Sequence, residues 1–341
     1  MSGRSDGLAG VAFVCPRCRA ALAHRTNSYE CTRCGGSYPV VLGIPDFRIT
    51  ADPWIAIADD REKGLRLERE TAGLDFEAMV RAYWAMTPDT PRERAARFIE
   101  HVLAAESRSQ EWLAAFGPAR DPEHAGPWLD VGCGTADIAA AAGRGAVVVG
   151  LDVAFRWLVV ARRRLAGRGL PVLLVCGNAE ALPFTSGTFS RAFCVGTLEH
   201  CEHLDRVLLE ARRVLAPGGQ FYARTVNRYS VLSEPHVGVW GVGWMPRRWA
   251  DRYVRWRSGQ RYLHHWPRGA GGIRRALARS GFAHARVDAG RVLAADRARL
   301  SPSFRPIASV YEGVRRVPVL RALCRWIAPV LDASGLAPRQ Q

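Results

Sequence analysis

Short apolar runs alternate with amphipathic stretches between residues 127 and 226. The runs are rich in Val, Leu and Ile and end at acidic or glycine residues, whereas the stretches between them carry apolar side chains three or four positions apart. Continuous apolar runs are typical of buried strands, and the longer period is typical of helices. This pattern predicts five strands, in the neighbourhoods of 128–130, 147–152, 171–176, 191–196 and 220–225.

The connections between these segments are short, and this decides the fold class. Alternating strands and helices with short loops predict an α/β fold with a doubly wound, mostly parallel sheet. Ligands of such sheets bind at the carboxyl ends of the strands. The residues that directly follow each apolar run are therefore the candidates for chemistry.

Changes of composition divide the rest of the chain. We expect a tail (1–10), a small cysteine-bearing module (11–48), a helical segment (49–126), the core (127–226), an insertion rich in aromatic residues and arginine (227–270) and a closing segment (271–341) that holds the end of the core and amphipathic helices. Residues 304–331 have helical periodicity with interleaved arginines, interrupted by Pro318 and Pro329. A basic amphipathic helix suits peripheral contact with an anionic membrane, but the pattern favours packing on the protein's own surface.

The charge balance narrows the protein class only slightly. The 341 residues carry a formal net charge of +16, and nearly all the positive charge is arginine, because Lys63 is the only lysine. Such a bias is weak support for a nucleic-acid or membrane partner. The amino-terminal residues lack the apolar core of a secretion signal, and no apolar run reaches the length of about 18 residues that a membrane span needs. The nine cysteines show no disulfide pattern, so we expect a cytoplasmic protein.

The clearest chemical signal is the stretch Trp128–Asp137, which reads WLDVGCGTAD. It predicts a strand, a tight turn with two glycines and the start of a helix, whose free N–H groups face any ligand there. Asp152, twenty residues after Gly132, ends the next strand and is placed to accept hydrogen bonds from both hydroxyls of a ribose. The dinucleotide fingerprint G-x-G-x-x-G fails because Asp137 holds its last position. Asp130, just before the first glycine, favours S-adenosylmethionine instead.

A second signal lies in residues 11–48. Cys15 and Cys18 form one C-x-x-C knuckle, and Cys31 and Cys34 form another after twelve intervening residues. Four thiolates at this spacing suit a tetrahedral zinc ion. Since no ligand position stays open, the expected role of Zn2+ is structural, and a module this small needs its metal in order to fold.

Taken together, the core segments resemble the class I S-adenosylmethionine-dependent methyltransferases, in the small-molecule branch that includes the ubiquinone O-methyltransferases. The matching motifs are LDVGCGTAD, VVVGLDV, GNAEALPF followed by SGTF, VGTLEH and ARRVLAPGG. The resemblance implies that the methionine part of the donor is bound by Asp130, Gly132 and Gly134, the ribose by Asp152 and the adenine amino group by Asn178, with Val153 and Ala179 beside the ring. Cys133 and Gly196 lie inside the matching motifs and complete the expected donor-binding set.

Three positions depart from the family pattern. Ser190 replaces the usual Asp after Phe189. Asn178 stands where Asp is commoner, but an amide oxygen still accepts a hydrogen bond from an amine. Ala136 stands where a third glycine is usual, and we expect its methyl group to be tolerated at the helix start.

The cysteine module resembles the Trm112-like zinc domain found at the amino terminus of some bacterial methyltransferases. The resemblance covers about 40 residues and ends in GIPDFR. The same pairing of zinc module and enzyme occurs in a ribosomal-RNA guanine methyltransferase family.

Methyl transfer to an oxygen atom also needs a base near the acceptor. His200 follows the fourth strand directly after Glu199, and His236 follows the fifth strand beside Glu234. His236, His200 and Glu199 are therefore the candidate catalytic residues. The pair His264-His265 is a weaker candidate, and the spacing of these histidines does not argue for a metal site.

The sequence thus predicts an enzyme that O-methylates a small molecule in secondary or cell-envelope metabolism. The insertion at 227–270 suits a planar, anionic or isoprenoid-type acceptor. It would equally suit RNA bases, so an rRNA or tRNA base methyltransferase that binds RNA through the zinc module is the first alternative. A non-catalytic interaction protein that binds S-adenosylmethionine and zinc is the second.

Overall fold

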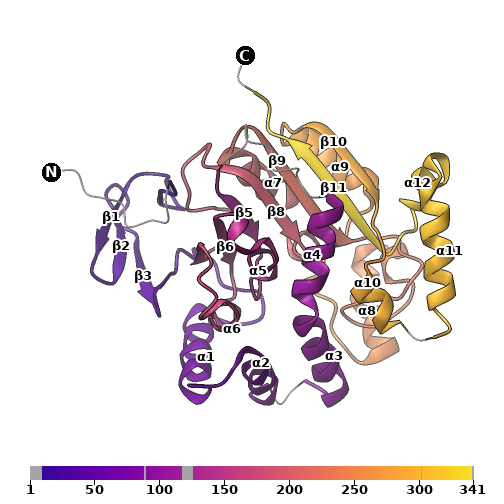
Figure 1. Ribbon diagram of the computed structural model, residues 1–341, viewed down its shortest axis with the longest axis horizontal. Coiled ribbons are helices and arrows are strands. Elements are labelled where there is room, and N and C mark those ends of the chain that lie inside the picture. The colour runs from indigo at the N-terminus through magenta and orange to yellow at the C-terminus, as the bar shows by residue number, and fades with distance from the viewer. Residues whose placement is uncertain (1–9, 88–89, 117–125, 301, 340–341) are drawn as a thin grey trace. The chain divides into compact units, whose positions relative to one another are not determined.

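Two β-sheets organise the chain (Figure 1). The structure is a computed structural model that describes residues 10–87, 90–116, 126–300 and 302–339. The predicted tail lies outside these residues except for Gly10. The chain divides into two units: unit 1 comprises Met1–Ala192 with Arg213–Ala216, and unit 2 comprises Phe193–Arg212 with Pro217–Gln341.

The larger sheet has seven strands in the order β10-β11-β9-β8-β5-β6-β7. β5 pairs in parallel with β6, and β6 with β7, whereas β11 runs antiparallel to β9 and β10. The predicted fold class, α/β with a doubly wound and mostly parallel sheet, is confirmed. The strands are β5 (Trp128–Val131), β6 (Val148–Asp152), β7 (Val172–Cys176), β8 (Phe189–Val195), β9 (Leu215–Val226), β10 (Ala283–Ala289) and β11 (Val330–Leu336).

Helices of unit 1 pack on one another around the α6 helix. The helices are α1 (Ile57–Glu70), α2 (Phe76–Ala85), α3 (Arg92–Leu103), α4 (Ala105–Phe116), α5 (Asp137–Ala142) and α6 (Phe155–Leu165). α1 and α2 share a hydrophobic core with α6 that includes Leu67, Met79 and Phe155. Gly64 allows the close approach of α1, because a Cβ atom there would lie 2.7 Å from the ring of Phe155. Helices therefore occupy most of the described part of segment 49–126, as the sequence predicts.

The smaller sheet belongs to the cysteine module and is part of unit 1. Its strands, in the order β1-β2-β3-β4, are β1 (Leu22–Arg25), β2 (Ser28–Cys31), β3 (Ser37–Val41) and β4 (Ile44–Pro45). The N–H group of Phe47 donates to the carbonyl of Cys176 at the end of β7, at 2.8 Å. The N–H group of Val14 donates to the carbonyl of Pro183 at 3.0 Å, and the ring of Phe13 packs on that of Phe47. Backbone hydrogen bonds thus join the module to the end of a core strand.

A buried ion-pair network holds the segment that leaves this module. Asp60 on α1 is fully buried and accepts hydrogen bonds from Nη1 of Arg48 and Nη1 of Arg156, each at 2.6 Å. It also accepts the N–H group of Phe155 at 2.7 Å, the first residue of α6. Each guanidinium group has a further carboxylate partner. Asp60 therefore ties the module exit, α1 and the amino terminus of α6 together.

Unit 2 contains the antiparallel part of the large sheet and most of the carboxyl-terminal helices. The helices with residues in this unit are α7 (Leu204–Val214), α8 (Arg247–Ser258), α9 (Ala270–Arg279), α10 (Ala294–Arg299), α11 (Arg305–Arg316) and α12 (Pro318–Cys324). The predicted helix at Ile273–Ser280 and the strand around Ala285–Val287 correspond to α9 and β10.

The strand β11 was not predicted from the sequence. The helical pattern at 304–331 is wrong at its end, because α12 ends at Cys324 and Val330 begins a strand. This strand lies between β9 and β10, so the strand that comes last in the sequence is inside the sheet and not at its edge. Its Asp332 is buried and pairs with Arg224 on β9 at 3.3 Å. An ion pair 108 residues apart in the sequence leaves no local signal.

Helices α11 and α12 expose much of their apolar surface. Ile307, Val310, Val319 and Leu323 have exposed fractions of 60, 65, 71 and 59%. Tyr311 anchors α11 to the residues before α10, since its hydroxyl donates to the carbonyl of Gly290 at 2.8 Å. The packing that the pattern favoured is therefore not made by these apolar side chains. Among the described residues, every helix is too short or too polar to cross a membrane.

Replacing Asp60 with Ala leaves two guanidinium groups buried without their shared partner. We expect the free energy of unfolding to fall by about 3–5 kcal/mol, the range for a broken buried ion pair. Urea unfolding followed by circular dichroism measures the change. Asp59→Ala is the matched control, because Asp59 is the exposed neighbour on the same helix, and it should change stability by no more than about 0.5 kcal/mol. Equal effects of the two substitutions would contradict the role of the network.

Candidate functional site

The glycine turn follows β5 in unit 1. The N–H groups of Gly132 and Cys133 both donate to the carbonyl of Leu151, at 2.7 and 3.0 Å. Gly132 and Gly134 have φ values of +76° and +49°, which residues with a side chain rarely adopt. Ala136 has φ of +57° and is accommodated at the start of α5, at a cost of about 1–2 kcal/mol in backbone strain. The positive φ explains why a third glycine is usual at this position.

Three carboxylates surround this turn. Asp130 is buried on β5, Asp137 is the first residue of α5 and Asp152 is the last residue of β6. Burial raises the pKa of Asp130 well above its ordinary value, and the neighbouring charges of Asp137 and Asp152 raise it further. Negative charge is therefore crowded at this end of the sheet. These three carboxylates fit a ligand that carries positive charge.

Asp152 is held in place by the two turns that flank it. Its Oδ2 atom accepts the N–H group of Gly134 and its Oδ1 atom accepts the N–H group of Ala154, each at 2.8 Å. Burial raises the pKa of Asp152, while these two hydrogen bonds lower it. Each carboxylate oxygen has capacity for a further hydrogen bond, so a vicinal diol could donate to both.

Asn178, beyond the end of β7, is engaged by the segment that leaves the cysteine module. Its Oδ1 atom accepts the N–H groups of Ile49 and Thr50, at 2.8 and 3.2 Å. Its Nδ2 atom donates to the carbonyl and the hydroxyl of Thr50, at 3.1 and 2.8 Å. This contact spans 128 residues of sequence and was not expected. Residues 49–50 therefore lie at the position that the family resemblance assigns to adenine recognition.

The remaining predicted donor residues have different surroundings. The carbonyl of Val153 accepts from Arg48 at 3.1 Å, and Ala179 is half-buried in the turn after Asn178. Cys133 is buried behind the glycine turn, where its Sγ atom would lie 2.9 Å from a Cβ atom on Gly150. Gly196 belongs to unit 2, has φ of +67° and donates its N–H group to the carbonyl of Arg224 at 2.8 Å.

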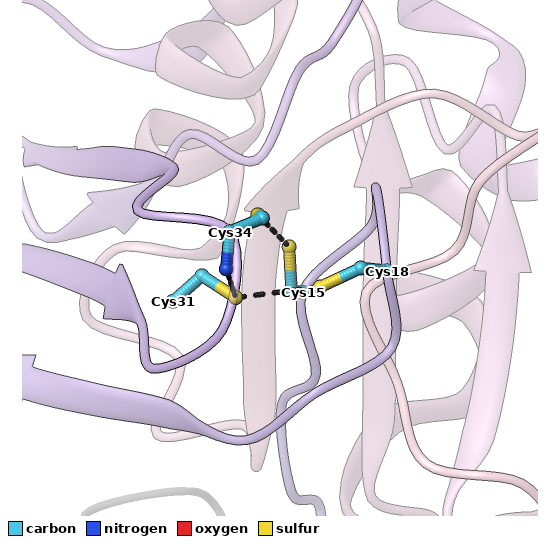
Figure 2. Close-up of side chains that lie close together, drawn as sticks. All are labelled: Cys15, Cys18, Cys31 and Cys34. Carbon is cyan, nitrogen blue, oxygen red and sulfur yellow. Dashed lines mark hydrogen bonds between the residues drawn. The ribbon is translucent and has the colours of Figure 1, made fainter.

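The four cysteines of the module converge (Figure 2). Their Sγ atoms all lie within 4.8 Å of one another, with 3.6 Å between Cys15 and Cys34 and 3.4 Å between Cys18 and Cys31. Four sulfur atoms bound to one zinc ion at about 2.3 Å would be about 3.8 Å apart. The sulfur positions therefore fit a tetrahedral metal ion with little adjustment.

Backbone N–H groups also prepare these sulfur atoms for metal. The N–H groups of Cys34 and Arg33 each donate to Sγ of Cys31 at 3.4 Å. The hydrogen bond from Cys34 is the largest contribution that lowers the pKa of Cys31 to about 6. Thiolate is the form of cysteine that binds zinc.

Three histidines of unit 2 gather around the short 3-10 helix Leu198–His200. The ring of His200 lies 4.8 Å from that of His236 and 5.2 Å from that of His265, and the last two rings stack at 4.4 Å. Glu234 fixes His236: its Oε1 atom lies 2.6 Å from Nδ1 of His236, and its Oε2 atom accepts the N–H group of the same residue at 2.9 Å. Glu199 is buried and accepts the hydroxyl of Thr225 at 2.6 Å. The structure thus brings together His200 and His236, the two candidate bases, with His265, which the sequence ranked as a weaker candidate.

The electrostatics of these histidines differ from one to the next. Burial opposes protonation of His236, but the hydrogen bond and charge of Glu234 outweigh it and raise the pKa of His236. Burial lowers the pKa of His265 to about 2, with further contributions from the charges of His236 and His200. Desolvation by the surrounding protein also lowers the pKa of His200, although part of this residue remains exposed to solvent. The cluster thus combines one basic imidazole with two that favour the neutral form.

Comparison with known proteins matches the core. A family model described as "Methyltransferase domain" matches residues 129–223. The ubiquinone/menaquinone biosynthesis C-methyltransferase of Methylobacterium nodulans is 34% identical over 154 residues, which cover 39% of this chain and 60% of the relative. Its counterpart from Brucella abortus is 40% identical over 116 residues, covering 32% of this chain and 41% of the relative. The chain therefore spans about 40 to 60% of the length of these relatives.

Solved structures resemble the chain more distantly. Phosphoethanolamine N-methyltransferase 2 of Haemonchus contortus, in complex with S-adenosyl-L-methionine, is 20% identical with a TM-score of 0.47, over 68% of this chain and 53% of that chain. The complex of the Haloferax volcanii Trm112 methyltransferase activator with a putative methyltransferase gives 17% identity and a TM-score of 0.47, over 77% of this chain and 98% of that chain. Values this low carry no argument about substrate or partner.

The sequence matches agree with the geometry of the site. The matched residues include the glycine turn, its carboxylates and Asp152 at the end of β6, all on the parallel part of the sheet. Residues 129–223 therefore match the methyltransferase-domain family, and this part of the chain is similar to the C-methyltransferases of ubiquinone and menaquinone biosynthesis.

Proposed function

We propose that the protein transfers a methyl group from S-adenosylmethionine to a small molecule. The observation that carries this proposal is the acid-lined glycine turn within the matched methyltransferase domain. The donor supplies an electrophilic methyl group on a positively charged sulfur; the sulfur–carbon bond breaks as the new bond forms, and a neutral thioether leaves. Asp130 and Asp137 offer negative charge to the amine and sulfonium groups, and Asp152 offers two oxygens to the ribose hydroxyls.

The acceptor is proposed to carry an acidic hydroxyl group. Transfer to that oxygen requires its proton to leave, and a positioned base contributes typically 10²–10⁴-fold to such steps. We assign activation of the hydroxyl to the cluster of His200, His236 and His265, with Glu199 and Glu234 supporting it. If the hydroxyl is on an aromatic ring, the second candidate is transfer to the ring carbon next to it, because the relatives are named C-methyltransferases. A phenolate oxygen raises electron density on that carbon, so the same proton must leave in both reactions.

We further propose that the four-cysteine module binds structural zinc. The convergent sulfur atoms and the N–H groups that point at Cys31 support this assignment. With four thiolates the coordination shell is closed, so the metal contributes to folding rather than to chemistry.

For the donor site, we expect Asp152→Asn to weaken S-adenosylmethionine binding by about 1.5–3 kcal/mol, roughly 10- to 150-fold in Kd, because one charged acceptor for the ribose is lost. Isothermal titration calorimetry measures the change, with circular dichroism to confirm folding. Asp59→Asn, an exposed aspartate in the same unit, should bind the donor as the parent does. An unchanged Kd for Asp152→Asn would remove the ribose assignment.

For the zinc module, we expect cobalt-loaded protein to show the intense sulfur-to-metal charge-transfer absorption of a tetrathiolate site. Cys31→Ser removes one of the four ligands and should abolish retention of metal by the module through gel filtration. Cys324→Ser, which alters a free cysteine outside the module, should leave the absorption unchanged. A module that stays folded without metal would contradict the structural role.

The acceptor is best found by transfer of labelled methyl groups into a cell extract separated into RNA and organic-soluble fractions. We expect label in the organic-soluble fraction, and at least about 100-fold less with His236→Ala, because the activating group is lost. Donor affinity should stay unchanged, and His203→Ala, which alters an exposed histidine outside the cluster, should transfer normally.

Other outcomes of this experiment separate the remaining candidates. Label confined to RNA would establish RNA base methylation instead, and donor binding without transfer to any fraction would favour a non-catalytic protein. Product analysis distinguishes an O-methyl from a C-methyl group.

A further inference from the structure

We propose that His200, His236 and His265 of unit 2 bind a divalent transition-metal ion of the Zn2+ class, in a second metal site separate from the cysteine module. The three side chains each place one ring nitrogen so that these atoms lie within 4.8 Å of one another. Three neutral imidazoles are a donor set that zinc, iron, nickel and copper ions accept.

The spacing of the rings matches what a shared metal ion requires. Three imidazole nitrogens bound at about 2.05 Å in tetrahedral directions place the ring centres about 5 Å apart. The measured separations of the ring centres are 4.4, 4.8 and 5.2 Å. The stacked pair, His236 and His265, departs most from this value and must open by about 0.6 Å. The arrangement is therefore close to a bound geometry.

Groups behind two of the histidines orient them as metal ligands are oriented. A histidine that binds a metal through one ring nitrogen almost always donates the N–H group of the other to a carboxylate, a backbone carbonyl or water. His236 has the carboxylate of Glu234 at 2.6 Å from Nδ1, so Nε2 is the nitrogen that would bind a metal ion. The backbone of His264 interacts with the ring of His200 and acts to raise its pKa. Plain packing of aromatic rings would not require either partner.

Glu234 is itself fixed by the loop that carries His236. Its Oε2 atom accepts the N–H groups of His236 and Val237, at 2.9 and 3.0 Å, and its own N–H group donates to the carbonyl of Val239 at 3.0 Å. A carboxylate with so many local hydrogen bonds keeps one position. His236 is therefore pre-organised before any ligand arrives.

Burial changes stepwise across the cluster. His265 is 7% exposed, the His236 side chain is 22% exposed and His200 is exposed. A metal ion bound by these three residues would have protein on one side and solvent on the side of His200. Three protein ligands with an open fourth position are the arrangement of catalytic rather than structural zinc sites. An oxygen ligand from water or from a hydroxylated acceptor would fill that position and lose its proton more easily.

This last role rests on the proposed function, whereas metal binding does not. The experiment therefore reads metal rather than methyl transfer. Full-length protein without a histidine tag is loaded with Co2+ or Zn2+, passed through a desalting column and analysed for metal per chain. We expect about two equivalents in the parent, one bound by thiolates and one by imidazoles. The imidazole-bound Co2+ adds weak visible absorption without a sulfur charge-transfer band.

Variants assign the second equivalent to its ligands. His200→Ala alters an exposed side chain, so folding is preserved, and it should weaken the second site by at least about 100-fold, while Glu234→Gln should weaken it by about 10- to 100-fold. His203→Ala is the control and should retain both equivalents. The thiolate band reports in every variant that the cysteine module is intact. A parent that binds a single equivalent, lost in Cys31→Ser, would overturn the proposal, as would a second equivalent that survives both His200→Ala and His265→Gln.

Discussion

The carboxylate of Asp60 is the interaction on which the organisation of unit 1 depends. Placing one charge between Arg48 and Arg156 in a fully buried position is expensive unless every polar group is paired, and here each guanidinium has two carboxylate partners. Arg48 lies where the chain leaves the cysteine module, and Arg156 belongs to α6. The network therefore fixes the module exit against the strand end that carries Asp152. Specific geometry, rather than net stability, is what such a network contributes.

The proposed donor site uses the opposite arrangement, in which like charges are gathered. Asp130, Asp137 and Asp152 raise the cost of ionisation at the end of the parallel strands. A site of this kind is poorly satisfied alone and well satisfied by a cationic ligand, so part of the binding free energy comes from relieving the repulsion. Its position follows from the strand order, since the carboxyl ends of β5 and β6 must lie together in a parallel pair.

The parts of the structure that the sequence predicted are those with local signals. The parallel strands follow from apolar runs, and the turn at Gly132 and Gly134 follows from residues that tolerate positive φ. Strand β11 was missed because its pairing partner Arg224 is far away in the sequence and the preceding helices mask its start. His265 was undervalued for the same reason, since only the tertiary fold brings it to His236. The contact of Asn178 with Thr50 likewise produces no periodic pattern in the sequence from which it could be predicted.

The segment between the cysteine module and α1 has one further consequence. At one end, the N–H group of Asp46 donates to the carbonyl of Pro39 in the module sheet, and at the other, Thr50 is clasped by Asn178. If a ligand at one end of this segment changes its conformation, the affinity for a ligand at the other end changes with it. If a metal ion in the module raises the affinity for the methyl donor by some factor, binding of the donor raises the affinity for that metal ion by the same factor. Loss of the metal ion and loss of the methyl donor would then each loosen the segment from Asp46 to Thr50, starting from opposite ends.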